Sequence, residues 1–329
     1  MPEQTLEQFE YGARQLARVG SMFISLAGGE PLLRDDIVDI AKIINQWHLG
    51  FITTNGYLMT PELANDLYAA GLWGVSVSID YADPTKHNRR RGMKDAFERA
   101  VDALGYLARA KRKAWQRINL MAVLMHDNID EIESLIKLAA EFNAYFMVQP
   151  YCVLKTGDIR FVCKDKHISK YLLELRKRYP NMLSNPYFLS QFDNALNGGV
   201  AGCKAGRAFF NIDSIGNISI CVEKRNTPSG NLYSDDIIEI FARMKQASKR
   251  NKCQACWYNC RGEVESLYNL YGLIRSLPTY LFDTGTAPTL NRAAFSGENS
   301  DKRIWHKTIR NNLSLTRIFE RDNSNKEFK

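Results

Sequence analysis

Short apolar segments alternate with amphipathic segments over the first 150 residues, and this alternation restricts the possible fold more than any other feature. Five segments have the length and composition of strands: 22–27, 50–54, 73–79, 117–126 and 145–150. The segments between them carry apolar residues at helical spacing: Asp35–Trp47, Pro61–Ala70, Ala96–Lys111 and Ile129–Asn143. Because strands that alternate with helices form parallel sheets, we predict an α/β fold with five parallel strands.

Polar and conformationally special residues follow the first three of these strands. The first strand runs into Gly28-Gly29-Glu30-Pro31, the second into Asn55, and the third ends in Ser78 and Asp80. The carboxyl ends of parallel strands meet at one edge of the sheet, where ligands bind. Any one of these endings alone is more often an ordinary turn or helix cap. Three endings in register predict a ligand site, in which glycines leave the backbone open to the ligand.

These residues together resemble the radical S-adenosylmethionine (SAM) enzymes. The resemblance covers about residues 5–150 and implies a partial (β/α)6 barrel. It implies that Gly28, Gly29, Glu30 and Pro31 bind the methionyl ammonium group and that Ser78 and Asp80 bind the ribose. In the family, an arginine at the position of Arg91 lies near the SAM carboxylate. Asn55 and Asn128 also fall at polar positions that match the family.

The sequence departs from this family at its amino-terminal end. The family's Cys-x3-Cys-x2-Cys loop, which holds the cluster that reduces SAM, should precede a helix at Thr5–Val19, yet residues 1–21 contain no cysteine. A strand should also precede that helix. Either the chain lacks its true amino terminus, or it is a degenerate relative. An uncovered edge of a parallel sheet is unusual in folded proteins, so we favour truncation and expect this chain alone to be inactive.

Five of the seven cysteines lie close together in the sequence, at Cys203, Cys221, Cys253, Cys256 and Cys260. They are compatible with disulfides, a zinc site or an iron-sulfur cluster. The sequence shows no signal-peptide pattern, so we expect a cytoplasmic protein, in which structural disulfides are rare. A four-thiolate zinc site remains an alternative. Thiolates are also the ligands of [4Fe-4S] clusters, which the neighbouring barrel favours.

The cysteine spacing resembles the auxiliary-cluster region of the SPASM and twitch branches of the radical SAM family. Cys203 and Cys221 flank a candidate hairpin, Phe209–Ile212 and Ile218–Val222, with Gly216 in its turn. The resemblance implies one auxiliary [4Fe-4S] cluster with Cys203, Cys221 and Cys253 as ligands and either Cys256 or Cys260 as the fourth. Of the remaining cysteines, we expect Cys152 to be buried by packing, although it follows the last barrel strand.

The chain divides into four expected parts. They are a truncated barrel at 1–160, a helical bridge at 161–200, the cysteine module at 201–265 and a helical, partly flexible extension at 266–329. We expect helices in the bridge at Lys164–Tyr179 and Pro186–Leu196, and one in the module at Asp235–Ser248. The extension contains a linker at Asp283–Asp301 and a basic helix at Lys302–Phe319.

The charge pattern argues against a nucleic-acid partner. The net charge is +8, but acidic residues lie between the lysines and arginines, as on a solvated surface. The apolar segment Leu267–Phe282 is too short to span a membrane.

By resemblance, the expected activity is SAM-dependent formation of a 5′-deoxyadenosyl radical, with ferredoxin or flavodoxin as reductant. A peptide is favoured as substrate over a sugar, lipid or cofactor precursor. The alternative is a non-catalytic iron-sulfur protein that transfers electrons or only binds. The sequence identifies no catalytic residue.

Overall fold

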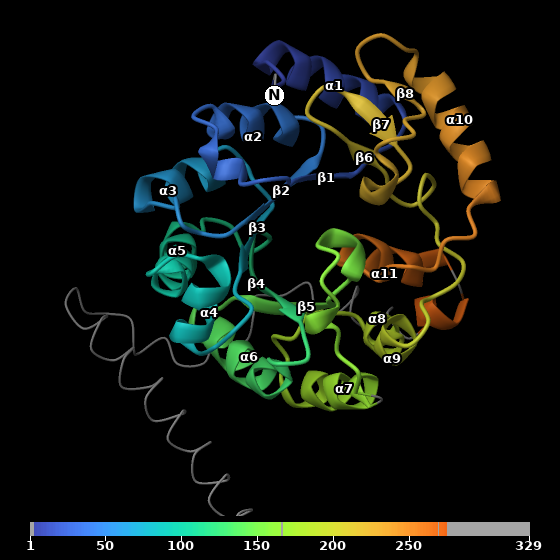
Figure 1. Cartoon of the computed structure of the whole chain (residues 1–329). Helices are drawn as coiled ribbons and strands as arrows, with labels where there is room; N and C mark the ends of the chain where they lie inside the picture. The colour runs from blue at the N-terminus through green and yellow to red at the C-terminus, as the bar shows by residue number, and fades with distance from the viewer. Residues whose placement is uncertain (1–2, 166, 269, 275–329) are drawn as a thin grey trace, which may run out of the picture. The chain divides into compact units, whose positions relative to one another are not determined.

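The five predicted strands form one parallel sheet with the order β1-β2-β3-β4-β5 (Figure 1). In the computed structural model, residues 3–165, 167–268 and 270–274 are described. The strand bounds are β1 Phe23–Leu26, β2 Leu49–Thr54, β3 Gly74–Ser78, β4 Arg117–Leu124 and β5 Tyr145–Pro150. The predicted α/β fold, a partial barrel, is therefore confirmed. Among the described residues, no strand pairs with the outer edge of β1.

The two faces of the sheet differ in burial. Val75 and Val77 of β3 are fully buried, as are Leu120 and Ala122 of β4, because helices cover this outer face. Toward the carboxyl ends of the strands, the alternate positions are only half-buried, whereas Ser76 and Asn119 are buried. The register aligns the half-buried positions across neighbouring strands: Ser78 with Met121, and Met121 with Met147. Since successive side chains point to opposite faces of a strand, these residues belong to an inner face that remains partly accessible.

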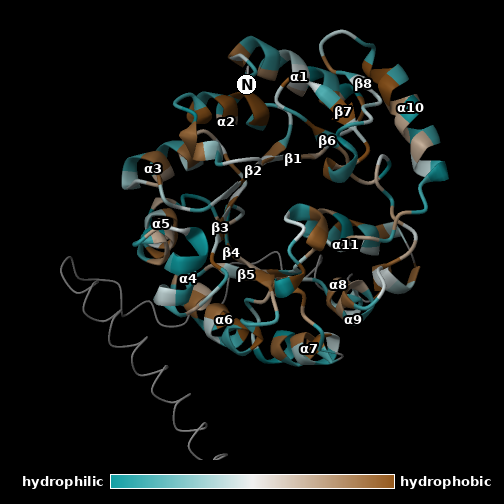
Figure 2. Cartoon of the chain, in the orientation of Figure 1, coloured by the Kyte–Doolittle hydropathy of each residue, from teal (hydrophilic) through white to brown (hydrophobic). Residues whose placement is uncertain are grey.

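The predicted barrel helices are present with slightly different ends. They are α1 Leu6–Arg18, α2 Ile37–Asn45, α3 Pro61–Ala69, α5 Ala96–Ala110 and α6 Ile132–Glu141. Two have clear start signals, since Thr5 forms a capping box with Gln8 and Thr60 caps a helix that begins at Pro61. Hydrophobic and hydrophilic residues alternate along these helices (Figure 2), so one side of each can pack on the sheet.

One barrel helix, α4 Pro84–Arg91, was not predicted. Asp83 caps its first turn, and Gly92 closes it with a positive φ of 69°. It has almost no apolar residues, so hydrophobic periodicity does not reveal it. Its Asp-Pro start and glycine end were the available signals. The helix matters because it carries His87 and Arg91 to the carboxyl edge of β3.

The bridge after the barrel is helical, as predicted. Its first helix is α7 Ile168–Arg178, but the second predicted helix is divided at Gln191 into α8 Pro186–Ser190 and α9 Phe192–Leu196. Between α7 and α8, residues 181–183 pass along strand β5. The Phe146 amide donates to the Asn181 carbonyl (2.8 Å), and the Leu183 amide donates to the Phe146 carbonyl (2.8 Å). A short extended segment thus covers part of the free edge of β5.

The predicted hairpin is confirmed and has a third short strand. β6 Asn211–Ile212 pairs antiparallel with β7 Asn217–Ser219, which pairs with β8 Gly230–Asn231. Helix α10 Ile237–Arg250 follows, close to the expected Asp235–Ser248. Figure 1 shows the hairpin beside α1. Leu16 of α1 belongs to the same buried cluster as Ile218, Leu232 and Ile240, so the module packs directly against the barrel's first helix.

Some predictions concern residues outside the described part of the chain. They are the linker at Asp283–Asp301, the helix at Lys302–Phe319 and the second half of the apolar segment Leu267–Phe282. Within the described residues, none of the helices is both long and apolar enough to cross a membrane.

Candidate functional site

The Glu30 carboxylate connects the ends of β1 and β2. Its Oε1 accepts hydrogen bonds from the Leu32 amide (3.1 Å) and the Thr54 hydroxyl (2.7 Å), and its Oε2 accepts one from the Asn55 amide (2.8 Å). An ionised carboxylate can accept about four hydrogen bonds, so one acceptor position remains on Oε2. That remaining position suits a cationic donor.

The two glycines beside Glu30 leave the backbone open. Gly28 has a φ of 146°, and both Gly28 and Gly29 are exposed. A Cβ atom at either position would have no atom within 4 Å. The glycines are therefore not required by tight packing against the rest of the protein. Their positions are consistent with a surface that a ligand approaches closely.

Asp80 lies at the end of β3, and each of its carboxylate oxygens accepts one hydrogen bond. Its side chain is 7% exposed. Oδ1 accepts from the Val123 amide of β4 (2.9 Å), and Oδ2 accepts from Arg91 Nη2 of α4 (3.0 Å). Asp80 thus holds three elements together. Ser78 is half-buried on the inner face, and its carbonyl also faces Arg91 Nη2 at 3.4 Å.

Arg91 has unused hydrogen-bonding capacity. Its Nε is buried and has no hydrogen-bond partner among the described residues. A buried guanidinium nitrogen without a partner is uncommon in folded proteins. The group lies at the same sheet edge as Ser78 and Asp80, where an anionic ligand would supply the missing acceptor.

His87 supports this edge from α4. Its Nδ1 accepts a hydrogen bond from the Asp80 amide (3.3 Å), and the ring is 1% exposed. Burial, together with the nearby positive charge of Arg91, lowers the pKa of His87 to about 3. Asn128, after β4, is fully buried and donates to the Asp80 carbonyl (2.7 Å). Both residues therefore fix the backbone around Asp80.

Asn55 has a local role in its turn. Its side-chain oxygen accepts from the Tyr57 amide (2.8 Å), while its own amide donates to Glu30. The structure thus brings Gly28–Pro31 and Asn55 together through Glu30. It brings Ser78, Asp80 and Arg91 together at the neighbouring strand end.

The five cysteines of the module gather from three segments. Cys203 is buried, whereas Cys221, Cys253 and Cys256 are half-buried and Cys260 is exposed. Burial raises the pKa of Cys256 to about 12. Negative charge on the neighbouring thiols also contributes: Cys221 and Cys203 act on Cys260, and Cys260 and Cys152 act on Cys256. The sulfur atoms are thus near enough to influence one another.

The gathered thiols are not arranged as a finished metal site. Among the described residues, no group of three histidine, cysteine or acidic side chains is positioned to hold a metal ion. The donor type fits a soft metal or an iron-sulfur cluster, but ligand geometry would require the thiols to move closer. The zinc alternative stays open on this evidence. Cys152, expected to be buried, is only half-buried, and its thiol faces the Ala255 carbonyl at 3.5 Å.

A buried arginine joins two of the three cysteine segments. Arg261, on α11 Asn259–Glu265, is 0% exposed, and its Nε donates to both oxygens of Glu265 (3.1 Å each). Its other nitrogens donate to the Cys256 carbonyl (2.6 Å) and to the Val200 carbonyl. Glu265 accepts from the Lys204 amide (2.6 Å). The pair thereby connects the chain around Cys203 with the chain around Cys256.

Two residues of interest were missed by the sequence analysis. Gln149 lies on the inner face of β5, and its Oε1 accepts from the Asn259 amide (3.4 Å). Both side-chain polar atoms of Asn259 are buried without a partner among the described residues. Period-two alternation in 145–150 could have identified Gln149. Asn259 is hidden inside the cysteine motif, where nothing distinguishes it from a spacer residue.

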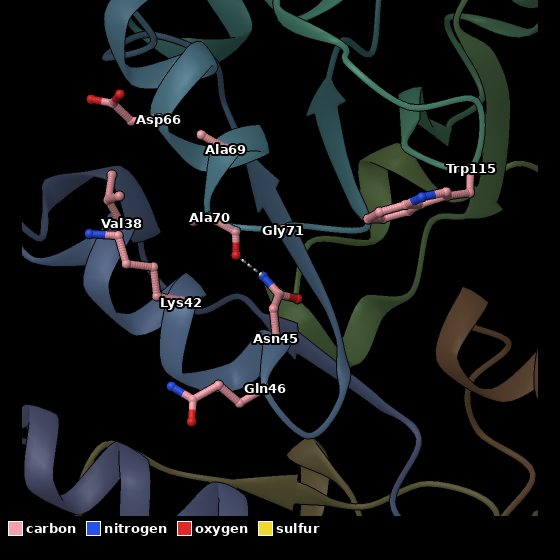
Figure 3. Close-up of a pocket in the computed structure, with 9 residues that line it drawn as sticks. All are labelled: Val38, Lys42, Asn45, Gln46, Asp66, Ala69, Ala70, Gly71 and Trp115. Carbon is pink, nitrogen blue, oxygen red and sulfur yellow. Dashed lines mark hydrogen bonds between the residues drawn. The ribbon is translucent and has the colours of Figure 1, made fainter.

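A groove of about 760 Å³ lies at the opposite edge of the sheet. Figure 3 shows Lys42 and Asn45 of α2, Asp66 of α3 and the Trp115 indole around it. Asn45 and Trp115 lie shortly before β2 and β4, so the groove is at the amino-terminal ends of the strands. It is separate from the polar strand ends described above.

Comparison with known proteins identifies a domain in the first part of the chain. Residues 1–139 match the profile of the Radical SAM superfamily. The chain is 27% identical over 292 residues to the AdoMet-dependent heme synthase of Methanosarcina barkeri (strain Fusaro / DSM 804), covering 79% of this chain and 82% of that protein. It is 26% identical over 268 residues to the mycofactocin maturase MftC of Mycolicibacterium smegmatis, covering 75% and 67%.

The fold is similar to that of a solved structure. The structure of Streptococcus suis SuiB bound to the precursor peptide SuiA aligns with a TM-score of 0.56 and 19% sequence identity. The alignment covers 72% of this chain and 58% of that chain. At this identity the match supports the fold alone. The aligned part of this chain spans little more than half of the length of the SuiB chain.

Replacing Arg261 with methionine should destabilise the cysteine module. The variant Arg261→Met keeps an apolar chain of similar length but leaves Glu265 buried without its charge partner. We expect the free energy of unfolding to fall by about 3–5 kcal/mol, measured by chemical denaturation. The exposed arginine at the end of α10 supplies a control, Arg250→Met. Equal stability of the two variants would contradict the role assigned to Arg261.

The buried His87 should make stability depend on pH. In the unfolded chain its pKa is about 6.5, so below that pH the unfolded state binds a proton that the folded state excludes down to about pH 3. The free energy of unfolding of the wild type therefore decreases as the pH falls below about 6.5. We expect His87→Gln to gain about 2 kcal/mol relative to wild type between pH 7 and pH 5. A difference in unfolding free energy that does not change with pH would refute this.

Proposed function

We propose that the chain binds SAM at the carboxyl edge of β1–β3 and forms part of an enzyme of the SPASM/twitch type that acts on a peptide, because residues 1–139 match the Radical SAM superfamily. The observation that carries the proposal is the Glu30 carboxylate. It is fixed by β1 and β2, retains an acceptor position on Oε2, and lies beside the open backbone of Gly28 and Gly29.

The residues at this edge have complementary tasks. Glu30 and the adjoining backbone carbonyls accept from the methionyl ammonium group. Arg91, whose Nε has no partner among the described residues, is placed to meet the methionyl carboxylate. Ser78 remains the candidate for the ribose. Asp80 remains a candidate for the ribose as well, since each of its oxygens accepts only one hydrogen bond, and it also holds Arg91 in position.

The cysteine module is proposed to hold one auxiliary [4Fe-4S] cluster. Cys203, Cys221 and Cys253 with Cys256 or Cys260 would be its ligands, and Arg261 connects the segment before Cys203 with Cys256. In radical SAM enzymes, reductive cleavage of SAM supplies a 5′-deoxyadenosyl radical that abstracts hydrogen from the substrate. Every cysteine here lies at or beyond Cys152, so we assign none of these residues to the cluster that reduces SAM. A ferredoxin or flavodoxin is the expected electron donor.

A peptide is the substrate class that the relatives favour. MftC is named a mycofactocin maturase, and the SuiB structure contains a precursor peptide. The partly accessible inner face, with Met121, Met147 and Gln149, offers room on the side of the sheet next to the proposed SAM site.

Removing the Glu30 charge should weaken SAM binding. Glu30→Gln keeps the shape of the side chain but replaces an acceptor with a donor that faces the ammonium group. We expect the Kd of SAM to rise about tenfold or more by isothermal calorimetry, because hydrogen bonds to charged groups are among the stronger ones. The exposed Glu62→Gln on α3 is the matched control. Equal affinities in both variants would overturn the placement of the ammonium group.

Anaerobic reconstitution should load the cysteine module with iron. We expect about four irons and four sulfides per chain, the stoichiometry of a [4Fe-4S] cluster. Cys203→Ala should lose them, whereas Cys163→Ala, a buried cysteine outside the gathered five, should retain them. Iron and acid-labile sulfide assays measure both. Zinc as the sole bound metal would instead support the four-thiolate alternative and contradict the cluster.

A further inference from the structure

The carboxamide of Asn259 is enclosed without a hydrogen-bonding partner. Neither its Nδ2 nor its Oδ1 finds one among the described residues, although both atoms are buried. Buried polar atoms in folded proteins are nearly always paired with protein, water or ligand. One donor and one acceptor therefore remain available in a single planar group.

This carboxamide lies at the inner face of the sheet. Asn259 begins α11, and its amide donates to Gln149 Oε1 (3.4 Å), which projects from the inner face of β5. Figure 1 shows α11 close to β5 on the side away from the outer helices. Gln149 is aligned with Val123 of β4, whose amide donates to Asp80 (2.9 Å). Asn259 and Gln149 therefore belong to the same carboxyl edge as the proposed SAM site.

A donor and acceptor side by side match one residue of an extended peptide. In an extended chain, the N–H and C=O of the same residue point to the same side, as in the paired residues of an antiparallel ladder. A single carboxamide can donate to that C=O and accept from that N–H. Hydroxyl groups of a sugar would also satisfy an isolated amide, but they impose no matched pair of opposite polarity.

We propose that Asn259, supported by Gln149, binds the backbone of one residue of an extended peptide substrate. The proposal rests on the proposed function and specifies how its substrate is held. Asn259 directly precedes Cys260 and contacts β5 through Gln149, so this subsite lies where the cysteine module meets the barrel. A peptide held there by backbone atoms is positioned with little dependence on its side chains.

Two small probes that differ only in one backbone N–H, which the second replaces with oxygen, test the subsite. N-acetylglycine N-methylamide presents an N–H and a C=O on one residue, and its ester analogue, acetylglycolic acid N-methylamide, replaces that N–H with oxygen. Binding is followed on the full chain by NMR of side-chain amides after selective 15N-asparagine labelling. We expect the amide probe to shift the Asn259 signals and to bind about tenfold more tightly than the ester.

Variants assign this preference to the named residues. Asn259→Leu should bind the amide probe about tenfold more weakly and lose the preference over the ester, whereas the exposed Asn65→Leu on α3 should behave as wild type. Gln149→Met keeps the length of the side chain but frees the start of α11, so it should also weaken binding. If Asn259→Leu does not fold, binding of the amide probe by Gln149→Met tests the proposal instead.

Equal binding of amide and ester by the wild type would overturn the proposal, as would a preference retained in both Asn259→Leu and Gln149→Met. Glucose that binds at least as tightly as the amide probe would indicate a hydroxyl site instead. These measurements use no SAM. If the protein prefers the amide probe but does not bind SAM, only the proposed function is refuted. If it binds SAM but shows no preference for the amide probe, only this subsite is refuted.

Discussion

The buried ion pair of Arg261 and Glu265 is the interaction on which the cysteine module depends. Arg261 is buried together with Trp257. Its nitrogens donate to the Cys256 carbonyl and to the Val200 carbonyl, just before Cys203. Two charges taken out of water are tolerated only when their hydrogen bonds are satisfied, and here the carbonyls and the Lys204 amide complete them. The thiols gather because this network holds their backbones, whereas the thiols themselves repel one another when ionised.

Carboxylates perform a similar task at the barrel edge. Glu30 connects β1 to β2, and Asp80 connects β3 to β4 and to α4. Each carboxylate accepts hydrogen bonds from backbone amides near strand ends, such as those of Asn55 and Val123. Backbone amides that the carboxylates did not accept from would need another partner. The proposed ligand positions are thus built from groups that also stabilise the fold. Fixed groups of this kind are already oriented before the ligand arrives, which reduces the ordering that binding requires.

Periodicity in the sequence was sufficient for the five strands and five of the barrel helices, because each buries one regular apolar stripe. It failed for α4, whose Arg91 and His87 are placed by tertiary contacts with Asp80. The ribose role of Asp80 was inferred from family resemblance, and nothing local in the sequence reveals that the Val123 amide, far along the chain, occupies its Oδ1. Asn259 could not be recognised either, since an unpaired amide is a property of the folded surroundings.

The difference between the two faces of the sheet has a consequence for how such a protein can change. Outer positions such as Val75 and Leu120 are fully packed under helices, and substitutions there disturb a dense core. Inner positions such as Ser78, Met121 and Met147 are only half-buried. A new side chain at an inner position meets solvent or ligand before it meets the core. Selectivity for the bound molecule can therefore diversify on one face of the sheet while the other preserves the architecture.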